Sequence, residues 1–511
     1  MREHTPSRFC RLCLAGFLLI IALSGGEEVR ALQTSDLNDS NIALAVEREL
    51  RSDPGVAAHR VDVTTTRGQV SLSGTVDNLL AKERAARVAR TVKGVRRVIN
   101  NIEIIPPPRS ERRIEEAVQT ALMLDPATES YQIEVGVNQG RVTLRGGVES
   151  TAEKELAATV AKKVAGVTGL NNQLTIRLQS VRSSSEIATG IEQTLKWNPL
   201  VDHERISVVV SDGVVELSGS VGSASEKQEA VDAAGINGVQ SIDAEQLRVV
   251  PGEGISARGP QRPLSDSEIR RAVLRKLSEH PRVETFEIEI SVQEGTVLLS
   301  GQVDHLKAKQ SAQWLARNTS GVWRVKNHLR VRPDDMPSDP SIVLDVRSAI
   351  KRNPLLGNDQ IKVSVDNGKV TLSGTVDSLF EMREAADAAS RVNGVIALNN
   401  NLRSPAATVS SFHPYVDKQS TVREYAEHLP PVASRQDDWE IAMDIRNELW
   451  WSPFVDRNQV DVQVHNGVAV LRGTVDSLLE SSAAEENARQ GGAAGVKNRL
   501  KIRQGPPDRQ P

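Results

Sequence analysis

Residues 361–376 read IKVSVDNGKVTLSGTV, and this stretch decides the fold of the segment around it. Apolar and polar residues alternate from Ile361 to Val365 and again from Val370 to Gly374, with Asn367-Gly368 between the two runs. Alternation is typical of a strand with one face in a core. Asn-Gly is the strongest short-range signal for a hairpin, because both turn positions need a positive φ. The stretch therefore predicts two antiparallel strands joined by a tight turn.

The same phrase recurs along the 511 residues. Its closing glycines, separated by 72, 73, 82, 73 and 99 residues, are Gly74, Gly146, Gly219, Gly301, Gly374 and Gly473. Recurrence of one phrase at steps of 72 or 73 residues, lengthened only where a linker is predicted, indicates a repeated fold. We expect these glycines to serve backbone geometry and not chemistry, at a tight bend from the second strand into a helix.

Two predicted helices flank each hairpin, and a third strand follows. Residues 342–351 carry apolar residues at helical spacing, and Asn353-Pro354 ends that helix because the residue before a proline avoids the helical region. After the hairpin, Ser378 and Glu381 form one of four Ser-x-x-Glu capping boxes, which begin a second helix. The order α-β-β-α-β predicts an α+β fold: a tandem array of six small units, each a three-stranded mixed sheet with two helices on one face.

The predicted units, here numbered one to six, are residues 37–105, 109–177, 182–249, 264–332, 337–404 and 435–502. Residues 250–263 and 405–434 are predicted linkers, and residues 503–511 a disordered tail. A unit of about 68 residues is marginal for independent stability. We therefore expect neighbouring units to pack on each other.

The phrase of unit five, together with its flanks, resembles the BON domain (bacterial OsmY and nodulation). The resemblance rests on Val370–Asp377, the alanine-rich segment 384–389, Gly394-Val395 and Asn399–Leu402. Across the repeats it covers about four-fifths of the chain. It implies an envelope or periplasmic protein that associates with phospholipid or other envelope components. The family is sometimes linked to osmotic stress or transport and is usually without enzymatic activity.

Two units depart from the shared pattern. Unit three has Ala244 at a position where the other units have asparagine, namely Asn100, Asn172, Asn327, Asn400 and Asn498. Unit six has Gly492-Ala493 where the others have Gly-Val. We expect no shared ligand role in units three and six.

The N-terminal residues predict export. Arg2, Arg8 and Arg11 precede an apolar run from Leu12 to Leu23, and small residues follow. This pattern is typical of a signal peptide, which we assign to residues 1–31. The run is shorter than the roughly 20 residues of a spanning helix, which favours cleavage over a retained anchor without deciding between them. We expect a periplasmic or exported location, and a position peripheral to a membrane is compatible with it.

Both cysteines, Cys10 and Cys13, lie in the predicted signal peptide. A cleaved chain would contain no thiol, which excludes disulfides, cysteine metal sites and a cysteine nucleophile.

Charge excludes one class of partner and suggests another. The formal net charge of −3 gives no overall basic field, so we expect no binding to nucleic acid. Basic residues gather in and just after the second helix of unit one, at Lys82, Arg84, Arg87, Arg90, Lys93, Arg96 and Arg97. These are candidate contacts for anionic phospholipid headgroups. A solvated outer face is the alternative interpretation.

Three tryptophans are candidate aromatic contacts. Trp197 and Trp451 stand two residues before the proline of their unit, where other units have mostly polar residues, and Trp450 precedes Trp451. They would either anchor in a membrane interface or pack against another unit. Packing is favoured, because tandem units need interfaces.

No pattern predicts catalysis. The histidines outside the signal peptide form no i, i+4 pair and recur at no equivalent position. No nucleotide-binding glycine motif or nucleophile elbow occurs. We expect no enzyme, no catalytic residue, no metal and no cofactor.

Two functional hypotheses follow. The first is a non-catalytic exported protein that binds phospholipid or maintains envelope integrity. The second is a protein-binding scaffold that recruits a transport or secretion partner. The sequence predicts neither the lipid nor the oligomeric state.

Overall fold

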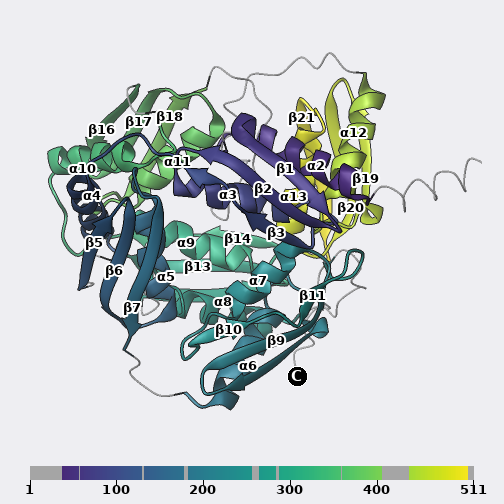
Figure 1. Ribbon diagram of the computed structural model, residues 1–511, viewed down its shortest axis with the longest axis horizontal. Helices are drawn as coiled ribbons and strands as arrows, with labels where there is room; N and C mark the ends of the chain where they lie inside the picture. The colour runs from purple at the N-terminus through teal and green to yellow at the C-terminus, as the bar shows by residue number, and fades with distance from the viewer. Residues whose placement is uncertain are drawn as a thin grey trace, which may run out of the picture.

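The computed structural model describes residues 37–56, 58–128, 132–177, 182–255, 264–283, 287–357, 360–404 and 437–503 (Figure 1). The predicted signal peptide, the linker 405–434, most of the linker 250–263 and the tail beyond Arg503 lie outside these residues. Within them the chain repeats small α-β-β-α-β units with mixed sheets, which confirms the predicted fold class.

The elements of the first three units follow the predicted order. Unit one has α2 (Asp39–Ser52), β1 (Val61–Thr66), β2 (Gln69–Val76), α3 (Leu79–Arg90), β3 (Arg97–Asn100) and β4 (Glu103–Ile104). Unit two has α4 (Glu111–Leu124), β5 (Ile133–Asn138), β6 (Arg141–Val148), α5 (Thr151–Lys162) and β7 (Gly169–Ile176). Unit three has α6 (Ser184–Lys196), β8 (Ile206–Ser211), β9 (Val214–Val221), α7 (Ala224–Ala234), β10 (Ser241–Asp243) and β11 (Leu247–Val249).

The last three units repeat this order. Unit four has α8 (Asp266–Ser278), β12 (Ile288–Gln293), β13 (Thr296–Val303), α9 (Leu306–Arg317), β14 (Arg324–Asn327) and β15 (Arg330–Val331). Unit five has α10 (Asp339–Arg352), β16 (Ile361–Asp366), β17 (Lys369–Thr375), α11 (Leu379–Ser390) and β18 (Ala397–Arg403). Unit six has α12 (Asp438–Trp451), β19 (Val460–His465), β20 (Val468–Val475), α13 (Leu478–Gln490) and β21 (Gly495–Ile502).

Each sheet has the second hairpin strand at its centre. In unit five, β17 pairs antiparallel with β16 and parallel with β18. In units one, three and four the third strand is interrupted, so that two short strands pair with the central one. The hairpin turn has the predicted geometry, with φ of 48° at Asn367 and 71° at Gly368.

The first helix holds this turn in place, a feature that the sequence pattern did not suggest. The carboxylate of Asp339, at the start of α10, accepts hydrogen bonds from the N–H groups of Asn367 at 2.8 Å and Gly368 at 3.0 Å. Asp39, Asp266 and Asp438 make the same pair of bonds in units one, four and six. A carboxylate at a helix N-terminus also interacts favourably with the helix dipole. Helix and hairpin are thus fixed to each other.

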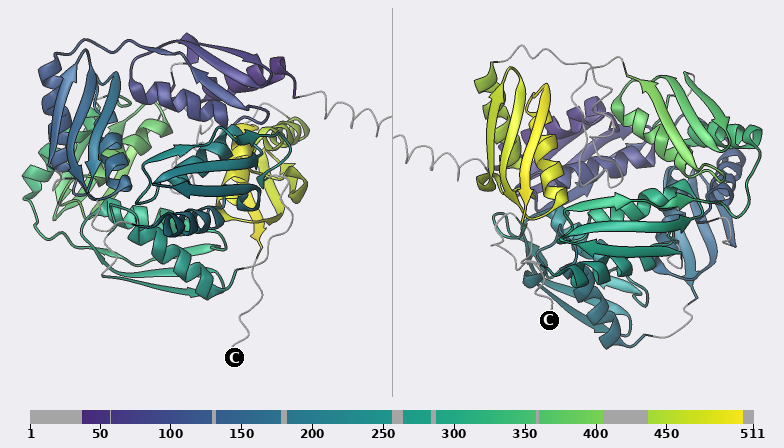
Figure 2. Two further views of the ribbon diagram at one scale, coloured as in Figure 1. Left: turned by 60° about the horizontal axis from the view of Figure 1, so that its bottom comes forward. Right: turned by 180° about the vertical axis from the view of Figure 1, so that it is seen from behind.

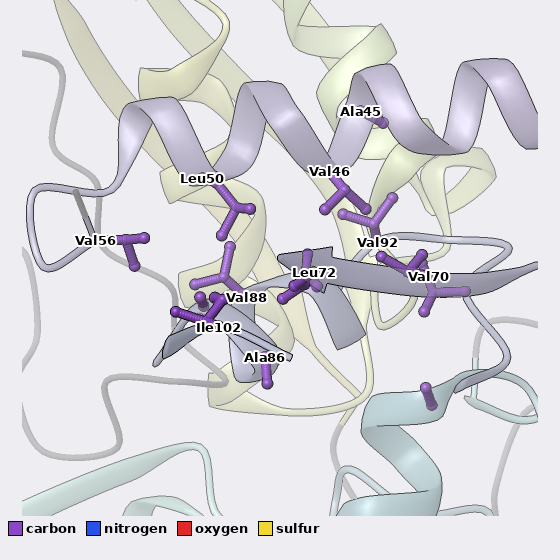
Figure 3. Close-up of a cluster of buried hydrophobic side chains, with 14 of the residues drawn as sticks. Ala45, Val46, Leu50, Val56, Val70, Leu72, Ala86, Val88, Val92 and Ile102 are labelled. Carbon is purple, nitrogen blue, oxygen red and sulfur yellow. The ribbon is translucent and has the colours of Figure 1, made fainter. Parts of the chain in front are cut away.

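Both helices of a unit cover one face of its sheet, and the core lies between the helices and the sheet. In unit one, Val46 and Leu50 of α2 meet Val70 and Leu72 of β2 and Val88 of α3 (Figure 3). All five side chains are buried. Valine, leucine and alanine supply nearly all of this core, which explains the low aromatic content of 3%.

The repeated glycines serve backbone geometry, but not for the predicted reason. Gly374 lies within β17, opposite Ile361 at the start of β16, and not at a bend into the helix. Its φ is 121°, and a Cβ at this position would overlap the carbonyl oxygen of Gln360. The other five have the same left-handed φ and the same conflict with the residue before the first strand: Gly74, Gly146, Gly219, Gly301 and Gly473.

The repeated asparagine joins the third strand to the second helix. In unit six the side-chain amide of Asn498 donates to the carbonyl oxygen of Ser481 in α13 at 3.0 Å, and its Oδ1 accepts from the N–H of Leu500 at 3.1 Å. Asn100, Asn172, Asn327 and Asn400 make equivalent bonds. The asparagine is therefore explained by packing of the unit.

The units meet in pairs that are not consecutive in sequence, except for one. The bond between two paired units has the same form each time. The donor is the backbone N–H of the residue before the glycine that follows the second helix, and the acceptor is the carbonyl oxygen of the residue two positions before the proline of the other unit. The three bonds are Lys93 to Trp451 at 3.1 Å, Ala165 to Arg352 at 2.9 Å and Ser320 to Trp197 at 3.2 Å. Unit one thus pairs with six, two with five and four with three.

A second kind of contact links units within each half of the chain. The first residue of the second helix packs on another unit of the same half. Leu79 of unit one joins the core of unit two, and Ala224 of unit three joins the core of unit one. The hydroxyl of Thr151 in unit two donates to the carbonyl oxygen of Ile236 in unit three at 3.4 Å. Units one, two and three thus contact each other in a closed ring. In the second half, Leu306 joins the core of unit five and Leu478 packs against that of unit four. The six units form one body, seen from three sides in Figures 1 and 2.

Candidate functional site

The basic helix predicted for headgroup contact lies largely inside this body. Arg84 is buried, and its Nε lies 2.7 Å from a carboxylate oxygen of Asp53, which is also buried. Its guanidinium also stacks on the ring of Phe380 from unit five, 4.6 Å from the centroid. Arg84 therefore joins two units, and its assignment as a headgroup contact is wrong.

The other six residues differ in exposure. Lys82, Arg87, Arg90 and Lys93 are half-buried, whereas Arg96 and Arg97 are exposed. Burial lowers the pKa of Lys93, and its ammonium lies 5.0 Å from the ring centroid of Trp450 in unit six. The predicted cluster thus divides into an interior part and an exposed end.

The exposed end belongs to a small basic patch, which we call the basic corner: Arg67, Arg96 and Arg97. Arg67 lies in the turn between β1 and β2, and the N–H of Arg96 donates to Gly68 of the same turn at 2.8 Å. Arg97 begins β3 beside Gln69. All three arginines are exposed. The carboxylate of the nearby Asp39 accepts hydrogen bonds from this turn. These bonds, from Gly68 first and then from Arg67, lower the pKa of Asp39.

The candidate tryptophans are half-buried at contacts between units. Trp451 packs against the core of unit one, and the carbonyl of Trp197 accepts from Ser320 and Lys276 of unit four. The contact of Trp451 favours the packing interpretation for that residue, whereas the bonds of Trp197 are made by its backbone. The sequence interpretation missed Trp439 of α12, which is 70% exposed, with Met443 one turn further along the helix 47% exposed.

Buried charges join units two, four and five. Asp387 of α11 lies 2.6 Å from Lys307 of unit four, 2.7 Å from Lys163 of unit two and 2.6 Å from Arg391, the residue that follows α11. Burial raises the pKa of Asp387, but these cations, Arg391 first, outweigh burial and hold it well below its usual range. We call these four residues the Asp387 cluster.

A second buried pair reinforces the same junction. Arg282 of unit four donates two hydrogen bonds to Asp125 of unit two, at 2.6 and 2.7 Å, and both side chains are 4% exposed. A bidentate pair fixes orientation as well as distance. Both ionic sites are explained as interfaces between units.

Two carboxylates meet where unit one pairs with unit six. Glu49 of α2 and Glu448 of α12 stand at equivalent positions, and Arg48 lies 3.3 Å from Glu448. Burial, followed by repulsion from Glu448, raises the pKa of Glu49 to about 7. We therefore expect the contact between these units to respond to pH.

We expect Glu49→Gln to flatten the pH dependence of stability. Because the folded-state pKa of Glu49 lies above its ordinary value of 4.5, the folded chain binds more protons than the unfolded chain between these values. The stabilisation is complete below about pH 4.5 and is lost as pH rises through about 7. Between pH 4.5 and 7.5 the unfolding free energy of the wild type should fall by on the order of 1–3 kcal/mol more than that of the variant.

Denaturant unfolding over this pH range checks the expectation. The control is Glu47→Gln on the same helix, where Glu47 pairs with Arg51 at 3.0 Å. Glu47→Gln should keep the wild-type slope. The same slope in Glu49→Gln and the wild type would contradict the assignment.

The described part of the chain contains no group of three or more histidine, cysteine, aspartate or glutamate residues placed to hold a metal ion. Among the described residues, no helix is both long enough and apolar enough to cross a bilayer.

The repeated unit also matches a known family. Residues 38–106, 110–177, 183–251, 265–333, 338–405 and 437–504 each match the BON domain. The chain belongs to the BON domain family. The match confirms the resemblance derived from the sequence, unit by unit.

Relatives share about a quarter of the array. Osmotically-inducible protein Y of Escherichia coli K12 is 33% identical over 146 residues, which are 27% of this chain and 73% of that protein. The outer membrane lipoprotein DolP of Haemophilus influenzae is 26% identical over 161 residues, 29% of this chain and 83% of that one. A 21 kDa hemolysin of Actinobacillus pleuropneumoniae is 28% identical over 137 residues, 26% and 70% of the two chains.

Among solved structures, CdsD, a structural protein of the type III secretion system of Chlamydia trachomatis, is 16% identical. The match covers 41% of this chain and 91% of that chain, with a TM-score of 0.12, which is too low to equate the two arrangements.

Proposed function

We propose that this BON array is a non-catalytic, exported envelope protein that binds anionic phospholipid through the basic corner of unit one. The observation that carries the proposal is the grouping of three exposed arginines on one turn and the adjoining strand. Each basic residue near an anionic membrane surface contributes about 1 kcal/mol to binding. The name of one relative, an outer membrane lipoprotein, supports an envelope location.

The body of six units supports this role by presenting the corner on a rigid surface. A fixed turn keeps the backbone of these residues from having to order on binding a headgroup. Trp439 and Met443 of α12 are an additional exposed apolar pair for the bilayer interface. A catalytic role is not part of the proposal, since the buried charged residues serve as contacts between units.

Vesicle flotation tests the proposal. We expect the chain to float with vesicles containing phosphatidylglycerol but not with vesicles of phosphatidylcholine alone. Loss of two charges in Arg96→Gln/Arg97→Gln should weaken anionic binding by about 2 kcal/mol, or roughly 30-fold, and added salt should weaken the wild type.

The control removes two exposed arginines elsewhere. Arg112→Gln/Arg113→Gln, on α4, changes the net charge equally and should bind within about twofold of the wild type. Equal losses in both variants would indicate overall charge as the cause and contradict the basic corner. No flotation of the wild type would contradict the phospholipid proposal as a whole.

A scaffold function is the second candidate, and one observation favours it. Residues of units four and six line a groove that is larger than the pockets beside Asp387 and Glu49. A groove that offers a strand edge and positive charge suits an extended peptide.

A further inference from the structure

A groove of about 1060 Å³ lies between unit four and unit six. Along one side runs β21 from Val496 to Ile502, and on the other side are Trp323, Arg324 and Val325 at the start of β14. Figure 2 (right) shows these two units, in yellow and teal-green, next to each other. The groove is at the upper end of the roughly 300–1,000 Å³ typical of small-molecule sites.

The β21 strand is at the edge of its sheet, and among the described residues no strand pairs with its outer side. It pairs with β20 over eight residues, Gly495 to Ile502, and lies at the end of the order β19-β20-β21. The third strands of units one, three and four are interrupted, whereas β21 is continuous. The backbone groups on the outer side of an edge strand are available to pair with another extended chain. Backbone pairing is a property that a peptide can use and a headgroup cannot.

Cations stand at alternate residues of this edge. Lys497, Arg499 and Lys501 are exposed, and no ion pair within the described chain engages them. Alternate residues of a strand lie about 6.6–6.8 Å apart on the same face. Carboxylates at alternate positions of an added strand would repeat at the same interval. The exposed Arg324 of unit four adds positive charge across the groove.

Little acidic charge opposes these cations. Glu485 is the acidic residue in the groove lining, and its carboxylate is engaged by Arg489 at 2.6 Å. Opposite charge on an incoming chain would therefore be favourable along the whole groove.

We propose that the groove between units four and six binds an extended acidic segment of a partner protein, which adds as a strand to the free edge of β21. Its backbone pairs with β21, and acidic side chains at alternate positions meet Lys497, Arg499 and Lys501. The proposal is independent of the phospholipid site, since it uses different units.

Fluorescence anisotropy of a labelled probe tests the proposal on the chain without residues 1–31. The probe is a capped eight-residue peptide of alternating glutamate and valine. Its comparisons are the glutamine-valine peptide and two N-methylated glutamate-valine peptides. One is methylated at the odd residues and the other at the even residues, so that each can form backbone hydrogen bonds along only one of its two edges. We expect binding of the probe, at least tenfold weaker binding of the glutamine peptide, and loss of binding for one N-methylated version.

Variants locate the site. Lys497→Gln/Arg499→Gln should weaken the probe at least tenfold with an unchanged melting temperature, since both side chains are exposed. Arg112→Gln/Arg113→Gln and the phospholipid variant Arg96→Gln/Arg97→Gln should leave probe binding within twofold. A failed phospholipid test therefore leaves this one intact, and the reverse also holds.

Three results would overturn the proposal. One is no binding of the probe to the wild type. Another is equal binding of both N-methylated versions, which would indicate charge attraction without strand addition. The third is unchanged probe binding in Lys497→Gln/Arg499→Gln, including the case in which this variant loses only its binding to phosphatidylglycerol vesicles.

Discussion

Asp387→Asn is expected to lower the free energy of unfolding by about 3–5 kcal/mol, because it removes the anion of a buried ionic cluster. Lys307 is 2% exposed and Lys163 and Arg391 are 24% and 13% exposed, so each cation would lose its contact with the Asp387 carboxylate at a place where little water can replace that contact. The loss should be concentrated where units two, four and five meet. Chemical denaturation at pH 7 measures the stability, and hydrogen exchange in α5, α9 and α11 shows where it is lost.

The control for Asp387→Asn is an exposed ion pair. Glu116→Gln breaks the contact of Glu116 with Arg112 on α4, whose side chains are 57% and 88% exposed. A pair of this kind contributes about 0–1 kcal/mol. If Asp387→Asn costs no more than Glu116→Gln, the cluster does not hold the three units together.

Gly374→Ala is expected to cost about 2–5 kcal/mol. The left-handed φ of 121° is strained for alanine, and the added Cβ would overlap the carbonyl oxygen of Gln360. The hairpin β16–β17 would have to separate at Ile361, which opens the core of unit five. Thermal unfolding of the whole chain measures the loss.

Gly357→Ala in the same unit is the matched control. A Cβ at Gly357 would meet no atom within 4 Å. This substitution should be neutral within about 0.5 kcal/mol. Equal stability of Gly374→Ala and Gly357→Ala would show that the repeated glycine is not required by the hairpin.

The sequence predicted what depends on neighbours along the chain. The alternation around Asn367-Gly368, the helix stop before Pro354 and the cap at Ser378 are local signals, and each lies where it was expected. Sixfold repetition strengthened these signals, because errors in one copy are averaged by the others. The fold class followed from them.

The sequence could not predict which faces are covered. Arg84 has the spacing of a solvated helix residue. Its partner Asp53 lies 31 positions away along the chain, and its other partner, Phe380, belongs to unit five. Pairing of unit one with unit six uses backbone groups at positions that other units share, so the sequence does not indicate which units pair. For the same reason the groove beside β21 became visible only when units four and six were placed together.

The central claim is that the six BON units close into one body through contacts between units far apart in sequence. Small-angle X-ray scattering of the chain without residues 1–31 tests it most directly. One compact body of this length should have a radius of gyration of about 23–27 Å. A value of roughly 45–50 Å, as for six separate units in a row, would contradict it.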